Sequence, residues 1–340
     1  MENLQDVRKI RRIAIILGLL VLSLVVILVS LSTGYANVTI HDVLRIFMGN
    51  GTVNENLVVF QFRLPRLILA CLVGMGLALS GALLQSLSRN DLADPGILGI
   101  NVGAGIMVVI IYRYFPKILI SQPFFLPIAA FIGALGVALL ICWLSINKDK
   151  GFSPMKMILM GIAIAAAGNA FILVTSLRLD RATYVAFSTW NIGNISGATW
   201  SQILVLLPWI VILIPIVLTK AKTLDALTLG EQSATSLGVN LFKEQMLLLM
   251  LAVALAAASV SIAGGIGFVG LIAPHISRRL VGSIHQYSLI TAALMGALLL
   301  MISDTVARVV FNPSEIPVGI VITVIGAPYF LYLLRKANKN

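Results

Sequence analysis

Charged residues are scarce in this chain. Only 11% of its 340 residues are charged, whereas 59% are hydrophobic, and the mean hydropathy is +1.02. A soluble domain carries about a quarter charged residues. The composition therefore excludes a soluble globular protein, and it predicts an all-α membrane protein whose helices cross the bilayer repeatedly.

Cysteine and histidine are too few and too scattered to predict a disulfide or a metal site. The two cysteines, Cys71 and Cys142, lie inside apolar runs without a partner at metal-ligand spacing, so we interpret them as small hydrophobic residues. The three histidines, His41, His275 and His285, form no cluster in the sequence. We therefore expect the chain to bind no metal or cofactor of its own.

The sequence also lacks the motif of an ATP-hydrolysing site. No Gly-Lys dipeptide occurs in it, which excludes a Walker A loop. Gly265, Gly267 and Gly270 match G-x-G-x-x-G, but no strand precedes them and no acidic residue follows about 20 positions later, as a dinucleotide site requires. We interpret these glycines as a turn between two spans, and we do not expect the chain to hydrolyse ATP itself.

Ten apolar segments come close to the roughly 20 residues that a helix needs to cross a bilayer core of about 30 Å. The first follows a basic stretch, but it is too long for the apolar region of a signal peptide and no cleavage site follows it. We expect a single membrane domain over residues 1–340. The predicted spans are Ile13–Leu31, Leu67–Leu87, Ile97–Tyr112, Leu126–Ile146, Met157–Leu177, Ile203–Leu218, Met246–Ile262, Ile266–Leu280, Leu289–Val306 and Pro317–Leu334.

The distribution of Lys and Arg between the spans predicts the orientation of the chain. With ten spans, 16 basic residues lie on one side and 8 on the other, which accounts for the 24 present. Because basic residues gather on the cytoplasmic side of membrane proteins, both termini are predicted to be cytoplasmic. The net charge of +11 thus reflects orientation, and since the basic residues form no patch on a soluble face, we expect no nucleic-acid partner.

One hydrophilic stretch, residues 223–240 (TLDALTLGEQSATSLGVN), separates two spans on the predicted cytoplasmic side. Its pattern predicts two short helices with a Gly-containing break, in which Leu224, Leu227 and Leu229 are apolar positions of the first helix and Gly238 ends the second. Such short helices are marginally stable alone, so the stretch needs a partner in the cytoplasm. The alternative is an amphipathic loop lying on lipid headgroups.

Ionisable residues are nearly absent from the predicted spans. Of 13 acidic residues only Asp304 lies within one, and Arg308 one turn further on predicts an i, i+4 ion pair. A proton-coupled or ion-coupled transporter would keep more such groups in mid-span. The neutral residues Gln85, Asn101 and Asn169 are candidates for lining a translocation path, and hydrogen bonding between helices is the alternative for each.

The outer side is predicted to carry a surface helix and three arginines at span ends. Arg63 and Arg66 precede the second span and Arg308 follows the ninth. Arginines fixed at such positions can receive carboxylates in bidentate fashion, and anchoring to lipid headgroups is the alternative. The surface helix lies in TIHDVLRIFMG, and the residues predicted on its apolar face are Ile40, Val43, Leu44 and Phe47.

Six motifs in this order resemble the permease family of ABC importers for iron-siderophores and cobalamin. They are RLPR (63–66), SGALLQ (80–85), LADPGILG (92–99), LGEQSATSLG (229–238), GFVGLIAPHISR (267–278) and IPVGIVITVIGAPYFLYLL (316–334). The resemblance extends from about Arg63 to the C-terminus.

The resemblance implies a ten-helix subunit of the bacterial cytoplasmic membrane that pairs with a second permease, identical or homologous. Cytoplasmic ATPase subunits that use ATP and Mg would bind on one side, and an extracytoplasmic substrate-binding protein on the other. The residues implied to dock the ATPase are Gly230, Glu231, Ala234, Leu237 and Gly238. The residues implied to meet acidic groups of the binding protein are Arg63, Arg66 and Arg308.

The function implied is the transmembrane subunit of an ATP-driven importer for a ferric siderophore. A permease for cobalamin or haem would share every motif above. An ATP-independent channel or secondary transporter is a different class, and it would not depend on Glu231 or Gly238. A membrane-embedded enzyme would need polar catalytic groups within the spans, and the sequence offers no such constellation.

Overall fold

The computed structural model describes residues 2–34, 39–116, 122, 124–147, 151–152, 154–310 and 315–337. Of the basic residues counted for orientation, Lys117, Lys148, Lys150 and Lys339 lie outside the described residues. The long helices are α1 (Glu2–Ser32), α4 (Leu64–Ser88), α5 (Ile100–Tyr114), α7 (Phe125–Ser145), α8 (Pro154–Ser176), α10 (Trp200–Thr219), α13 (Leu241–Ala263), α14 (Val269–Val281), α15 (His285–Val309) and α16 (Val318–Ala337).

Shorter elements connect these helices. They are α2 (Ile40–Phe47), α3 (Val53–Asn56), the π-helix η1 (Leu57–Arg63), the 3-10 helix η2 (Pro95–Leu98), α9 (Arg181–Ile192), α11 (Ala221–Thr228) and α12 (Glu231–Ser236). Two antiparallel strands of two residues each, β1 (Ile146–Asn147) and β2 (Gly151–Phe152), form the sheet found in the described residues.

The predicted all-α architecture is confirmed, because each of the ten predicted spans overlaps one of the long helices. In the described part of the chain, eight helices are long and apolar enough to cross a membrane, and α5 is a shorter apolar helix. α14 has only 13 residues, since a turn precedes it and Arg278 and Arg279 occupy its last turn. Gly265 and Gly267 lie in that turn, as predicted, whereas Gly270 lies inside α14.

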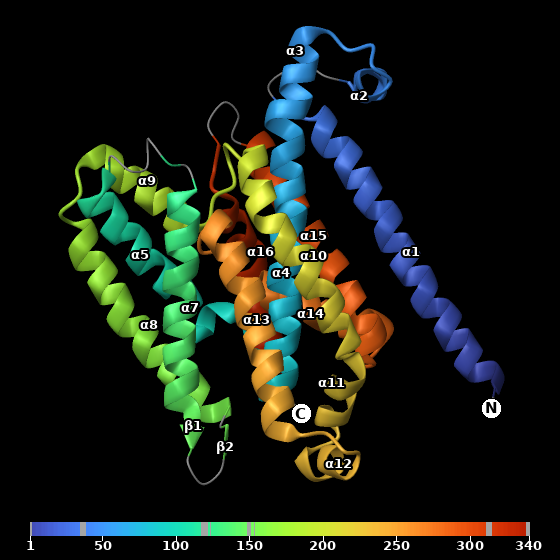
Figure 1. The fold of residues 1–340 in the computed structure, drawn as a ribbon. Helices are drawn as coiled ribbons and strands as arrows, with labels where there is room; N and C mark the ends of the chain where they lie inside the picture. The colour runs from blue at the N-terminus through green and yellow to red at the C-terminus, as the bar shows by residue number, and fades with distance from the viewer. Residues whose placement is uncertain are drawn as a thin grey trace.

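α4 lies at the centre of the bundle, and α10, α13, α14 and α15 pack around it (Figure 1). Glycines allow the closest approaches. A Cβ atom at Gly81 would collide with the carbonyl of Gly270 in α14, and one at Gly74 would collide with that of Gly296 in α15. Membrane helices pack closely where small residues face each other, so these glycines bring α14 and α15 against α4.

The two ends of the bundle carry different short helices (Figure 1). α2, α3 and α9 lie at one end. α11 and α12 lie at the other, where α1 also begins and α16 ends. An even number of crossings explains why both termini lie at the same end.

The helix predicted near residue 40 exists as α2. A capping box between Thr39 and Asp42 starts it. α2 buries Val43 and Ile46, whereas Ile40, Leu44 and Phe47 are each about half exposed. Ile40, Leu44 and Phe47 therefore form an apolar face that the described residues leave partly uncovered, while α2 also packs on α1.

Candidate docking and coupling sites

The polar stretch predicted to form two short helices does form them. We call residues 221–240, which contain α11 and α12, the α11–α12 segment. Gly230 precedes α12 with a φ of +109°, and Gly238 follows it with a φ of +83°. Side chains with a Cβ rarely adopt such angles, so glycine at both positions defines the turns that begin and end α12.

One face of the α11–α12 segment attaches it to the bundle. Leu224, Leu227 and Ala234 are buried, with exposed fractions of 0%, 3% and 0%. At the junction with the transmembrane helices, Lys220 Nζ pairs with Glu244 at 2.9 Å and so joins the end of α10 to the start of α13. The segment is therefore anchored by apolar contacts and by an ion pair.

The other face of the segment is open. Leu229 and Leu237 are 68% and 65% exposed, and Glu231 and Gly238 are exposed beside them, while Gly230 is half-buried. Of the five residues predicted to dock an ATPase, Ala234 is the one whose side chain packs inward. Two exposed leucines beside an acidic residue form a small apolar surface that no described residue covers.

Arg89 links this segment to α4, and the sequence reasoning missed it. It follows α4 with a φ of +50°, which is rare for a residue with a side chain. Its Nη2 donates to the carbonyl of Leu227 at 3.2 Å. Cavities of about 400 and 330 Å³ flank α12, and both are lined by Arg89 and Glu231. No local pattern signals this link, because the partners are 138 residues apart.

The three arginines predicted to receive carboxylates lie at the end of the bundle that carries α2 and α3. Arg63 and Arg66 are buried, with exposed fractions of 5% and 6%. Arg66 Nε donates to Asp304 Oδ1 at 2.7 Å, and its Nη1 donates to Glu315 Oε2 at 2.7 Å. Arg63 donates to the carbonyl of Leu31. These side chains therefore already hold helices of the same chain together.

The predicted ion pair between Asp304 and Arg308 was wrong. Asp304 bonds Arg66 of α4, and Arg308 donates to the carbonyl of Ser30 in α1 at 2.6 Å. Spacing within α15 favours an i, i+4 pair, but Arg66 reaches Asp304 inside a buried helix interface, where a bonded ion pair is stronger than at a surface. Each charge of α15 thus connects to a different neighbouring helix.

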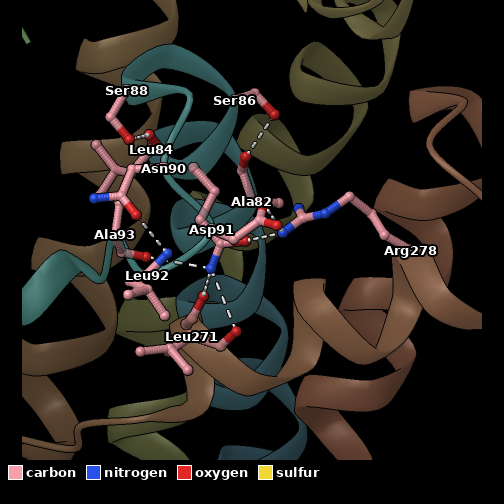
Figure 2. A network of polar contacts seen from close by, with 12 residues as sticks. Ala82, Leu84, Ser86, Ser88, Asn90, Asp91, Leu92, Ala93, Leu271 and Arg278 are labelled. Atoms are coloured by element: carbon pink, nitrogen blue, oxygen red, sulfur yellow. Dashed lines mark hydrogen bonds and ion pairs between the residues drawn. The ribbon is translucent and has the colours of Figure 1, made fainter. Parts of the chain in front are cut away.

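Gln85, a predicted path residue, lies inside a hydrogen-bond network, and its partners Ala93, Leu271 and Arg278 are labelled in Figure 2. It is 2% exposed. Its Nε2 donates to the carbonyl oxygens of Ala93, Gly270 and Leu271 at 3.2, 3.2 and 3.3 Å. Its Oε1 accepts from Arg278, which also pairs with Asp91 at 2.9 Å. Gln85 therefore joins α4 to α14 and to the connector before α5. Hydrogen bonding between helices was the alternative that the sequence left open for this residue.

Asn101 and Asn169, the other two predicted path residues, lie on neighbouring helices. Asn101 is half-buried near the start of α5, and Asn169 is exposed on α8. α8 packs on α5 through Gly168, where an added Cβ would collide with Val102. Gln85 instead points from α4 to α14 and the connector before α5, and no hydrogen bond among the described residues joins it to either asparagine.

The connector between α4 and α5 contains a carboxyl group with an unusual environment. Asp94 begins η2, and its Oδ1 accepts from the N–H of Gly96 at 2.8 Å. Burial of the carboxyl group raises the pKa of Asp94 to about 6, although the bond from Gly96 acts in the opposite direction. The connector folds back on α14, where a Cβ at Gly270 would lie 2.6 Å from Pro95 Cδ.

Comparison with known proteins covers nearly the whole chain. The sequence model of the FecCD transport family matches residues 20–336. The chain is 47% identical over 321 residues to the iron(3+)-hydroxamate import system permease protein FhuG of Bacillus subtilis (strain 168), covering 93% of this chain and 95% of that protein. It is 37% identical over 328 residues to the hemin transport system permease protein HmuU of Yersinia pestis, covering 93% and 95%.

A solved structure has the same fold. It is described as an inward-facing conformation of a metal-chelate type ABC transporter, and it superposes with a TM-score of 0.81 at 29% identity over 95% of this chain and 99% of that chain. The resemblance read from the six sequence motifs is thereby confirmed. With its multi-pass helical bundle and a family match from residue 20 to residue 336, the chain belongs to the FecCD transport family and is an ABC-transporter permease.

Proposed function

We propose that this chain is the transmembrane subunit of an ATP-driven importer that moves a ferric siderophore into the cytoplasm. The observation that carries the proposal is the open face of the α11–α12 segment. Its leucines are about two-thirds exposed beside Glu231, although its other face is fixed to the bundle. Membrane proteins that act alone have no need for such a built and uncovered surface.

The partner proposed for the open face is a cytoplasmic ATPase, which would bind ATP and Mg. Glu231, Leu237 and Gly238 would make the contact, whereas Gly230 would shape the turn and Ala234 would hold α12 against the bundle. This assignment also sets the orientation: the α11–α12 end and both termini face the cytoplasm, in agreement with the 16 to 8 division of basic residues.

At the opposite end we propose that an extracytoplasmic substrate-binding protein docks through acidic groups near Arg63, Arg66 and Arg308. Glu315 is the exposed member of this cluster, since 41% of its side chain is accessible, compared with 7% for Arg66. A partner's carboxylate would therefore have to replace Glu315 on Arg66. Docking would exchange one ion pair for another.

A second permease, identical or homologous, is proposed to cover α8. Asn169 is exposed within this membrane helix, and an amide that faces lipid is costly. A second subunit or a water-filled path would remove that cost. Asn101 and Asn169 are the better candidates for the path, because Gln85 is enclosed. No cofactor bound by this subunit is part of the proposal.

The substrate proposal is supported by the relatives. The 47% identical protein is named as an iron(3+)-hydroxamate permease, and a 40% identical protein, FeuC of the same strain, as an iron-uptake permease. The 37% identical HmuU is named for hemin transport. A ferric hydroxamate siderophore is therefore the first choice, and haem and cobalamin are the alternatives.

The test is uptake of radioactive iron in cells with and without this chain. Ferric hydroxamates, ferric citrate, haem and labelled cobalamin would each be presented separately. We expect deletion to abolish uptake of a ferric siderophore and Glu231→Ala to reduce it, while Lys222→Ala, an exposed residue of α11 outside the docking set, leaves it unchanged. Loss of haem or cobalamin uptake alone would contradict the substrate; normal uptake by Glu231→Ala would contradict the docking role.

A further inference from the structure

His285, the first residue of α15, connects three helices through its side chain. Its Nδ1 lies 2.6 Å from Oδ1 of Asp225 in α11, and its backbone N–H donates to the same oxygen at 3.0 Å. Its Nε2 lies 2.8 Å from Oγ of Ser86 in α4. We call these three residues the Ser86–His285–Asp225 relay.

The hydrogen atoms of the relay can be counted. Ser86 has one hydroxyl proton, which it donates to the carbonyl of Ala82 at 2.9 Å, as Figure 2 shows. Nδ1 of His285 donates to Asp225, because a carboxylate only accepts. The role of Nε2 towards Ser86 depends on the tautomer of the ring. The bond to the Asp225 carboxylate is charge-assisted, and such bonds are about twice as strong as neutral ones.

The relay is buried at two of its three members. His285 and Ser86 are 4% and 9% exposed, whereas 40% of the Asp225 side chain is accessible. A cavity of about 310 Å³ lies beside it, lined by Ser86, His285 and Thr228 among others. Side chains do not fill this space, so packing does not join α11 to the bundle here. The hydrogen bonds of the relay provide that connection.

The order Ser, His, carboxylate is also that of a hydrolase triad, but the geometry does not support hydrolysis. Ser86 lies within α4 and directs its hydroxyl proton to Ala82, four residues earlier in the same helix. A nucleophilic serine must instead give its proton to the histidine.

We propose that His285 is a positioning residue that transmits movement of α11 to the ends of α4 and α15. This inference rests on the proposed function, in which an ATPase moves the α11–α12 segment. Leu224 and Leu227 attach α11 through apolar contacts that can slide, whereas the relay fixes the direction of the displacement. When α11 moves, Asp225 moves with it and displaces His285 through their hydrogen bond. Ser86 then transmits this displacement to α4, the central helix of the bundle.

The test is the amount of iron transported per ATP hydrolysed by the complete transporter, with its ATPase and binding protein, in proteoliposomes. The probe is a ferric trihydroxamate siderophore labelled with radioactive iron. We expect His285→Ala to lower this ratio about fivefold or more, the lower end of the range for coupled sites, while the ATPase rate persists. Asp225→Ala should act similarly, Asp225→Asn should retain more of the ratio, and the double variant His285→Ala/Asp225→Ala should be no worse than either single variant.

Ser88→Ala is the matched control for Ser86→Ala. Ser88 Oγ donates to the carbonyl of Leu84, four residues earlier, at 2.6 Å, and among the described residues no hydrogen bond joins it to α11 (Figure 2). Ser86→Ala should lower the ratio and Ser88→Ala should not. If His285→Ala leaves the amount of iron transported per ATP unchanged, including when transport and ATP hydrolysis fall in proportion, the relay is rejected. If the unaltered transporter moves no iron with ATP, the proposed function itself fails.

Discussion

The two ends of this permease use their polar residues differently. At the end with α2 and α3, Arg63 and Arg66 are buried, and Arg66 is paired with Asp304 and Glu315 of the same chain. At the end with α11 and α12, Leu229, Glu231 and Leu237 are exposed. A charged side chain that is enclosed and paired within the bundle mainly stabilises the fold. An exposed residue on a helix that glycine turns hold in place is available to a partner. Substitutions of the buried charges should therefore affect stability, and substitutions of the exposed residues of α12 should affect transport.

The largest stability effect is expected from Asp304→Ala. Asp304 is 1% exposed and paired with Arg66, so the change leaves a buried arginine with one partner fewer. Removing one member of a buried ion pair costs about 3–5 kcal/mol. Thermal unfolding of the purified protein in detergent measures it. The control is Glu315→Gln, whose partly exposed carboxylate should cost about 0–1 kcal/mol; equal effects of the two variants would contradict the description of this end.

An intermediate effect is expected at the turns around α12. Gly230→Ala and Gly238→Ala each place a Cβ at a positive φ, which costs about 1–2 kcal/mol. Gly267→Ala is the control, because open space surrounds Gly267 and its φ lies outside that region. Chemical denaturation of the three variants would measure the differences. Equal stability of all three would show that the turns do not depend on glycine.

A stability change close to zero is expected for Leu237→Asp and Glu231→Ala. Both residues are exposed, and surface substitutions usually change the free energy of unfolding by less than about 0.5 kcal/mol. Transport should nevertheless fall strongly, because these residues form the proposed ATPase contact. Parallel measurement of unfolding and uptake separates the two effects. A large loss of stability in these variants would remove the distinction between the ends.

The last prediction concerns the pH dependence of stability through Asp94. Its folded pKa of about 6 lies above the usual value of 3.8, so the folded protein binds the proton more tightly than the unfolded chain. The stability contributed by this group is full below pH 3.8 and is lost as the pH rises towards 6. Asp94→Asn keeps an oxygen to accept from Gly96 and should remove this component. Unfolding midpoints between pH 4 and pH 7 that fall identically in both proteins would contradict the assignment.

The sequence predicts the helices well and the contacts between them poorly. Hydropathy located all ten long helices, and the polar residues 223–240 located α11 and α12, because both signals are local. The Arg66–Asp304 pair joins residues 238 positions apart, and Ser86 and His285 are 199 apart, so no spacing rule indicates either. The predicted Asp304–Arg308 pair was wrong for the same reason: a local rule was applied where a neighbouring helix supplied the partner.

The outcome at the predicted site residues follows the same division. Glu231, Leu237 and Gly238 are exposed as a docking surface requires, since a hydrophilic stretch between spans must face water. Gln85 is enclosed, because an amide within a span bonds to backbone as readily as it lines a path. Composition shows that a polar residue is present in a span, and only the packed structure shows which way it faces.

The central claim is that the α11–α12 end couples this permease to ATP hydrolysis. The most direct measurement is ATP-dependent uptake of a labelled ferric trihydroxamate by proteoliposomes that contain the complete transporter, for the unaltered chain and for Leu237→Asp, with thermal unfolding in parallel. The account predicts uptake that requires ATP and is lost in the variant at an unchanged unfolding temperature. Uptake without ATP, or full uptake by Leu237→Asp, would contradict it.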